Sequence, residues 1–117
     1  MKYSDLQVWQ KAMDLVEKIY LFTRKLPEEE KFGLASQMQR AAVSIPSNIA
    51  EGNSRASTKE YIKFLYIAKG SNSELLTQLM ICERIGYKDL EYLKEAKKLC
   101  EEISKMLTSM ILKLGDL

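Results

Sequence analysis

The chain has 117 residues, of which 46% are hydrophobic and 29% charged, the composition of one soluble globular domain over residues 1–117. Its formal net charge of +2 is too small to indicate nucleic-acid binding by itself. The chain contains no histidine, which excludes Ser-His and Cys-His nucleophile pairs within it and the Glu-x-x-His ligands of di-iron helix bundles.

Targeting signals and ligand-binding patterns are also missing from the sequence. No apolar run approaches the roughly 20 residues that span a bilayer, so we expect no membrane partner. The start, MKYSDLQVW, lacks a cleavable signal pattern, which predicts a cytoplasmic protein. Cys82 and Cys100 have no CxxC spacing and fall in the apolar phase of predicted helices, so we expect both to be reduced core residues. We expect no cofactor, no metal, no small-molecule substrate and no enzymatic activity.

The first predicted helix covers residues 4–26, with Ser4 or Asp5 as its cap and Pro27 as its end. It carries two apolar stripes, which indicates a helix covered on two sides, by its own core and by a neighbouring subunit. A wide face in an ordinary monomer is the alternative. The first stripe consists of Leu6, Trp9, Met13, Val16, Tyr20 and Thr23. The second consists of Ala12, Leu15, Ile19, Phe22 and Leu26.

The second predicted helix covers residues 33–51 and follows an acidic connector, whose carboxylates favour the positive end of the helix dipole. Pro46 should kink this helix and Gly52 should end it. Its apolar stripe consists of Leu34, Met38, Ala41, Ile45 and Ile49. Its polar stripe consists of Gln37, Arg40, Ser44, Ser47, Asn48 and Glu51.

The third predicted helix covers residues 58–85 and begins with a capping box formed by Ser57 and Glu60. Its core seam contains one polar residue, Asn72, next to Gly70. Glycine inside a helix costs about 1 kcal/mol relative to alanine, so close approach of another helix is the simplest compensation. Such an approach predicts a hydrogen bond from Asn72 to the polar stripe, at Ser44, Ser47 or Asn48.

The fourth predicted helix covers residues 89–114, after a turn in which Gly86 ends the third helix and Asp89 caps the fourth. Four amphipathic helices joined by short connectors predict an all-α protein, an antiparallel up-down-up-down four-helix bundle.

Two groups of residues are candidates for function. A row of cations with one aromatic residue could follow a phosphate backbone while the ring stacks on a base, although most such rows are solvated surface. This row consists of Arg55, Lys59, Lys63, Tyr66 and Lys69. The polar stripe, joined by Asn72, could contain paired acids at Glu51 and Glu74. Without a nucleophile or a phosphate loop, we interpret it as structural.

The same residues resemble a family of small four-helix bundles often encoded by intervening sequences in bacterial 23S ribosomal RNA genes and often labelled a ribosomal protein family. The most specific match is RAAVSIPSNIAEG over 40–52. Further matches are DLQVW over 5–9 with Ala12, GL over 33–34 with QM over 37–38, and AKGS over 68–71 with EL over 74–75 and QL over 78–79.

This family is similar in fold to the basic accessory proteins of diversity-generating retroelements, which form homopentameric barrels linked to nucleic acid. The resemblance therefore implies a homopentameric ring for this chain. We expect a non-enzymatic binding or scaffolding module with RNA or DNA as its first candidate partner. The alternative is a protein–protein interaction module that binds no nucleic acid.

Overall fold

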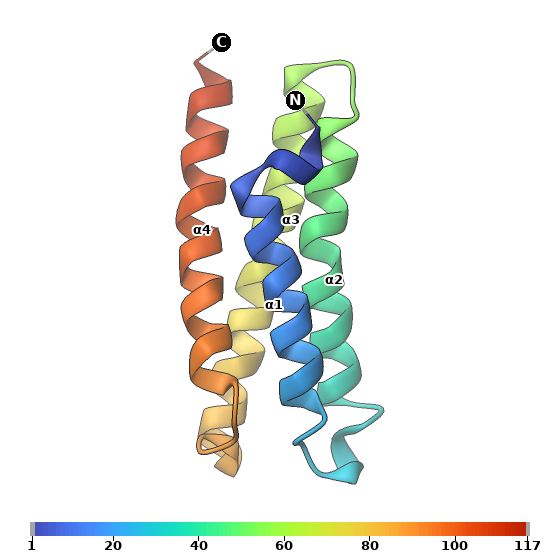
Figure 1. The fold of residues 1–117 in the computed structure, drawn as a ribbon, viewed down its shortest axis with the longest axis vertical. Helices are drawn as coiled ribbons and strands as arrows, with labels where there is room; N and C mark the ends of the chain where they lie inside the picture. The colour runs from blue at the N-terminus through green and yellow to red at the C-terminus, as the bar shows by residue number, and fades with distance from the viewer. Residues whose placement is uncertain (1, 117) are drawn as a thin grey trace.

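A computed structural model describes residues 2–116, and it contains four long α-helices and, within that range, no β-strand (Figure 1). The four-helix, all-α fold predicted from the sequence is confirmed. The helices are α1 (Gln7–Thr23), α2 (Leu34–Asn53), α3 (Thr58–Cys82) and α4 (Leu93–Gly115). Short 3-10 turns lie at Tyr3–Asp5 and Glu28–Glu30, and a π-helical turn at Glu83–Tyr87 follows α3 directly.

The helices stand side by side in a rod of 46 × 21 × 20 Å. Figure 1 shows that their connectors lie at alternate ends of the rod, so that residues 54–57 are at the same end as both chain termini. Helix α1 packs against α2 and α4, and α3 packs against the same two helices from the other side. Each helix therefore has two helical neighbours and an outward face.

The core forms where the predicted apolar stripes meet. On α1 the second stripe, from Ala12 to Leu26, is completely buried, which identifies it as the stripe that faces the core. The first stripe is only partly covered: Met13 keeps 40% and Tyr20 38% of its surface exposed. Residue positions three and four apart share one face of a helix, so two stripes on α1 must point in two directions. The chain itself covers only one of them completely.

Both cysteines are free and buried, as predicted. Burial raises the pKa of the Cys82 thiol to about 11 and that of Cys100 to about 12. The Sγ atom of Cys82 lies 3.9 Å from Sδ of Met38, where the thiol joins α3 to α2. Neither cysteine is poised to react, because a reactive thiol needs a lowered pKa and solvent access.

Several predicted helix ends need correction. Helix α1 begins at Gln7 with Leu6 in the N-cap position, so the cap predicted at Ser4 or Asp5 is wrong. Helix α4 begins at Leu93 and not at residue 89. The reason is Tyr92, whose φ of 76° is left-handed and prevents the helix from extending back to Asp89.

Helix α3 ends at Cys82 and not at residue 85, and Gly86, with a φ of 107°, lies within the π-helical turn that follows. The predicted cap at Ser57 is confirmed. At the start of α3, the backbone N–H of Glu60 donates a hydrogen bond of 3.2 Å to Oγ of Ser57.

Gly52 does not end the helix as predicted, because α2 continues to Asn53. A Cβ atom at this position would lie 2.8 Å from Cβ of Phe64 and 3.2 Å from the carbonyl oxygen of Tyr61. Gly52 therefore permits the close approach of α2 and α3. Helix α2 also continues through Pro46, and the kink expected there stays a prediction.

Candidate nucleic-acid interface

The predicted basic row begins on the outward face of α3. Lys59, Lys63 and Tyr66 are exposed, and Tyr66 keeps 56% of its surface accessible. Their spacing of four and three residues places them one above the other on the helix. Among the side chains that the structure describes, neither lysine has a carboxylate oxygen within 4.0 Å. These three residues form a compact surface of two free cations and one ring, which we name the α3 basic patch.

Arg55 lies at the edge of this patch but is already engaged. Its Nη2 atom lies 2.9 Å from Oε1 of Glu51, and its guanidinium lies 4.9 Å from the centroid of the Phe64 ring. Both contacts hold the guanidinium against the α2–α3 corner. Arg55 is therefore a weaker candidate than the two lysines, since an anion would have to compete with Glu51.

Lys69 is separated from the patch. It is half-buried, and it lies six residues after Lys63, which at 3.6 residues per turn places it about 120° around the helix. The structure therefore brings together three of the five predicted residues and leaves Lys69 on a different face of α3.

The polar stripe of α2 does not act as one network. Gln37, Arg40, Ser47 and Glu51 are exposed, whereas Ser44 and Asn48 are half-buried. Asn48 donates to both the carbonyl and the hydroxyl oxygen of Ser44, at 2.8 and 2.9 Å. The Ser44 hydroxyl in turn lies 2.8 Å from the hydroxyl of Ser71 on α3. This single chain of hydrogen bonds joins the stripe to α3.

The hydrogen bond predicted from Asn72 to α2 is wrong. Asn72 is 1% exposed, and its Nδ2 donates to the carbonyl oxygen of Cys100 on α4 at 2.8 Å. The neighbouring Ser71 makes the contact with α2 instead. Successive residues on a helix point about 100° apart, so Ser71 and Asn72 cannot both face α2.

The structure does not join the candidate acids into a catalytic pair. The carboxylate of Glu51 faces Arg55, and Glu74 is exposed on α3. Within residues 2–116, no three Cys, Asp or Glu side chains group into a metal site. The same part of the chain contains no helix that is both long enough and apolar enough to cross a membrane.

Two further surfaces flank α1, and the sequence indicated only the α1 half of one of them, through the first apolar stripe. On the α4 side, Lys11 pairs with Glu102 and Lys18 with Glu95, each at 3.0 Å, and Lys25 lies 3.8 Å from Glu91. We name this surface the ion-pair face. The hydrogen bond from Lys11 lowers the pKa of the Glu102 carboxyl, and the hydrogen bond to Glu95 raises the pKa of Lys18.

On the α2 side, α1 and α2 border a groove of about 360 Å³ in which no lining residue carries a charge. We name it the uncharged groove. The first apolar stripe of α1 is the sequence signal for this groove, because the bundle core covers only the second stripe and something else must cover the first. The groove is lined by Tyr3, Trp9, Met13, Val16, Val43, Pro46, Ser47 and Ala50.

Comparisons with known proteins agree with this fold. A search of curated proteins found no match. Among solved structures, the chain is similar to a protein of unknown function from the S23 ribosomal protein family of Bacteroides thetaiotaomicron VPI-5482. The two share 27% identity with a TM-score of 0.81, over 89% of this chain and 97% of that one. The model of the 23S rRNA-intervening sequence protein family matches residues 4–109. The chain therefore belongs to the 23S rRNA-intervening sequence protein family.

Proposed function

We propose that this protein is a non-enzymatic, homo-oligomeric bundle that binds nucleic acid through the α3 basic patch. The observation that carries the proposal is the pair of exposed lysines, Lys59 and Lys63, which lack carboxylate partners in the described chain, next to the exposed ring of Tyr66. Lysines neutralise phosphates, and an aromatic ring stacked on a base contributes about 1–3 kcal/mol. RNA and DNA both offer these two contacts.

A single patch of this size binds weakly, so the proposal includes assembly. In a ring, copies of the patch contact one strand together, and each further contact forms at a high effective concentration. The resemblance to the pentameric accessory proteins of retroelements favours five subunits. The partly covered first stripe of α1 supports assembly, because it supplies apolar surface for a neighbouring subunit.

The outward face of α3 beyond the α3 basic patch, toward the C-terminal end of the helix, supports the same conclusion. Gly70 lies in the middle of this helix, and no heavy atom beyond its own helix backbone and neighbours lies within 4 Å of a Cβ added there. The monomer therefore gives no steric reason for glycine. Ile67, three residues before it, and Ile81, eleven residues after it, are 43% exposed each. A second helix packed against this face would explain both the small residue and the exposed isoleucines.

Binding of a structured RNA at several salt concentrations tests the function. We expect affinity to fall as salt rises, because bound lysines release counterions. Replacing Lys59 and Lys63 together by Glu should remove most of the binding, and the matched double change of Lys105 and Lys113 to Glu should weaken it much less. Absence of RNA and DNA binding even at low salt would refute the proposal.

The uncharged groove favours a second candidate function, a protein-interaction module that binds no nucleic acid. Such a partner would place apolar side chains between α1 and α2. This candidate predicts a partner that survives nuclease treatment and is lost when Met13 is replaced by Glu.

A further inference from the structure

A second group of lysines surrounds a cavity at the opposite end of α3 from the α3 basic patch. The cavity has a volume of about 510 Å³ and lies where the turn after α3 meets the start of α4. This volume is in the range of small-ligand sites. We name it the α4 lysine cavity. Its lining residues are Glu83, Lys88, Leu93, Lys94, Lys97, Lys98 and Glu101.

The charges of this cavity are not balanced. Nζ of Lys97 lies 2.9 Å from Oε1 of Glu83, which neutralises one lysine. Within the described residues, Lys88, Lys94 and Lys98 have no carboxylate oxygen within 4.0 Å. Lys98 also borders the ion-pair face, together with Glu95 and Glu102. In the lining of the cavity itself, four lysines stand against two glutamates, Glu83 and Glu101. Excess positive charge therefore remains in the cavity.

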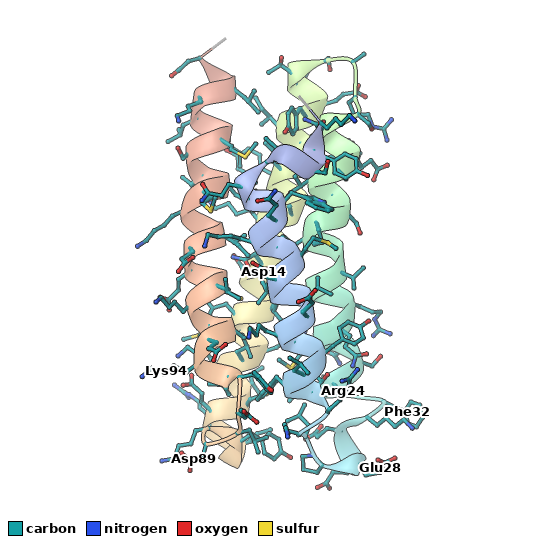
Figure 2. All side chains as sticks on the ribbon, in the orientation of Figure 1. Asp14, Arg24, Glu28, Phe32, Asp89 and Lys94 are labelled. Carbon is teal, nitrogen blue, oxygen red and sulfur yellow. The ribbon has the colours of Figure 1, made fainter. Side chains whose placement is uncertain are left out.

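The positions of Lys94 and Lys98 on α4 are also unfavourable for positive charge. Lys94 lies in the first turn of the helix, where the dipole is positive and a cation is unfavourable. Lys94 and Lys98 are also four residues apart, a spacing at which like charges repel. Lys94 extends away from the bundle into solvent (Figure 2). A bound anion would offset both costs.

The start of α4 also presents backbone donors. Its N-cap residue, Tyr92, makes no side-chain hydrogen bond to the helix. In the described chain, no backbone or side-chain acceptor is recorded for the N–H groups of Leu93, Lys94 and Glu95. Leu93 and Lys94 line the cavity, so these donors belong to its wall. Lysine side chains and free N–H groups together form the chemistry that holds phosphate groups in proteins.

The backbone around the cavity is unusual and firmly held. Tyr92 is the one non-glycine residue with positive φ in residues 2–116, and a π-helical turn precedes it. The hydroxyl of Tyr87 donates to Oε2 of Glu30 at 3.0 Å, which ties this turn to the α1–α2 connector. Nζ of Lys18 lies 5.5 Å from the Tyr92 ring centroid. Strained residues and π-turns persist where the surroundings impose them, and they gather at functional sites.

We propose that the α4 lysine cavity binds a phosphate-bearing anion, with Lys88, Lys94 and Lys98 supplying charge and the start of α4 supplying N–H donors. The anion is either a phosphodiester of a nucleic acid or a free polyphosphate. This site stands apart from the proposed function. Lys63 and Glu83 are separated along α3 by about 30 Å at 1.5 Å per residue, so each cluster can be removed without touching the other.

Titration of the protein with tripolyphosphate at low salt tests the cavity. Binding is monitored by calorimetry and by NMR of the backbone amides. The wild-type protein should bind, with amide shifts concentrated at 93–95. Replacing Lys94 and Lys98 together by Gln should lower affinity about tenfold or more, because charge-assisted contacts are lost. The matched double change of Lys59 and Lys63 to Gln should leave tripolyphosphate affinity unchanged. Equal affinity in both double variants, or shifts located elsewhere, would overturn the proposal.

The same variants separate a binding defect from a folding defect and identify the source of the phosphate. Without anion, the Lys94 and Lys98 double variant should melt no lower than wild type, because it removes a cation from the first turn of α4 and a repulsion between like charges four residues apart. A loss of affinity for an RNA duplex in this variant assigns the site to nucleic acid. Unchanged RNA affinity with lost tripolyphosphate binding assigns it to free polyphosphate. If RNA affinity survives the loss of Lys59 and Lys63, the proposed function of the α3 basic patch is refuted, whereas the proposal for the α4 lysine cavity is not.

Discussion

Helix α1 borders two surfaces of opposite character. On the ion-pair face, three lysines of α1 or its end reach carboxylates of α4 or the preceding turn. On the uncharged groove, Trp9, Met13 and Val16 lie beside Val43 of α2 with no charged residue lining the space. Water solvates the first surface well. The second leaves apolar area in contact with water, and such patches typically mark interaction sites. The difference makes the uncharged groove the side on which the proposed neighbouring subunit would pack.

Introducing a charge into the uncharged groove should have the largest effect. Met13→Glu should dissociate the assembly, because an unpaired carboxylate buried at an interface costs several kcal/mol. The monomer should still fold, since Met13 is 40% exposed within the single chain. Mass measurement in solution, together with circular dichroism, checks both statements.

The matched control lies on the other side of the same helix. Lys11→Gln on the ion-pair face should leave the mass unchanged. If Met13→Glu assembles like wild type, the uncharged groove is not the interface.

Gly52→Ala should have the next largest effect, on folding of the single chain. The new Cβ would meet Cβ of Phe64 at 2.8 Å, so α2 and α3 would have to separate. We expect the free energy of unfolding to fall by about 1–3 kcal/mol, as for other overpacked cores. Urea denaturation measures this. An unchanged midpoint would show that α2 and α3 do not require this close contact.

Gly70→Ala should act in the opposite direction on the monomer. Nothing in the chain obstructs a Cβ there, and alanine favours a helix by up to about 1 kcal/mol over glycine. The monomer should therefore gain stability while the assembly weakens, if a neighbouring helix approaches α3 closely. Denaturation at low protein concentration and mass at high concentration separate the two effects. A variant that is more stable and assembles as tightly as wild type would show that the outer face of α3 is not part of the subunit interface.

Glu102→Gln on the ion-pair face should have the smallest effect. The hydrogen bond from Lys11 lowers the pKa of the Glu102 carboxyl in the folded state below its ordinary value. This carboxylate therefore stabilises the fold above that value, and the contribution disappears as the pH falls through the folded pKa. Melting curves of wild type and variant should differ slightly at pH 7 and converge in acid. A difference that persists in acid would contradict this account.

Much of the fold could be predicted from the sequence, because each helix carries its own apolar periodicity. The cap at Ser57 follows from residue type alone, whereas α3 ends at Cys82, before the stop expected at Gly86. The start of α4 could not be predicted, since a left-handed tyrosine at 92 has no signature in the sequence. The hydrogen-bond partner of Asn72 could not be predicted either. Neighbouring positions on α3 point about 100° apart, so an error of one residue changes which helix a side chain faces.

The candidate site was predictable in part. Lys59, Lys63 and Tyr66 follow from their spacing. The pairing of Arg55 with Glu51 was not recognised, although the two residues are four apart, because the helix was expected to end at Gly52. The α4 lysine cavity depends on the turn after α3, whose geometry only the structure supplies.

Native mass spectrometry of the wild-type protein most directly tests the claim that one side of α1 remains for another copy of the chain. The account predicts a species of five chains that dissociates when Met13 is replaced by Glu. A single 13.5 kDa chain at all concentrations would contradict it.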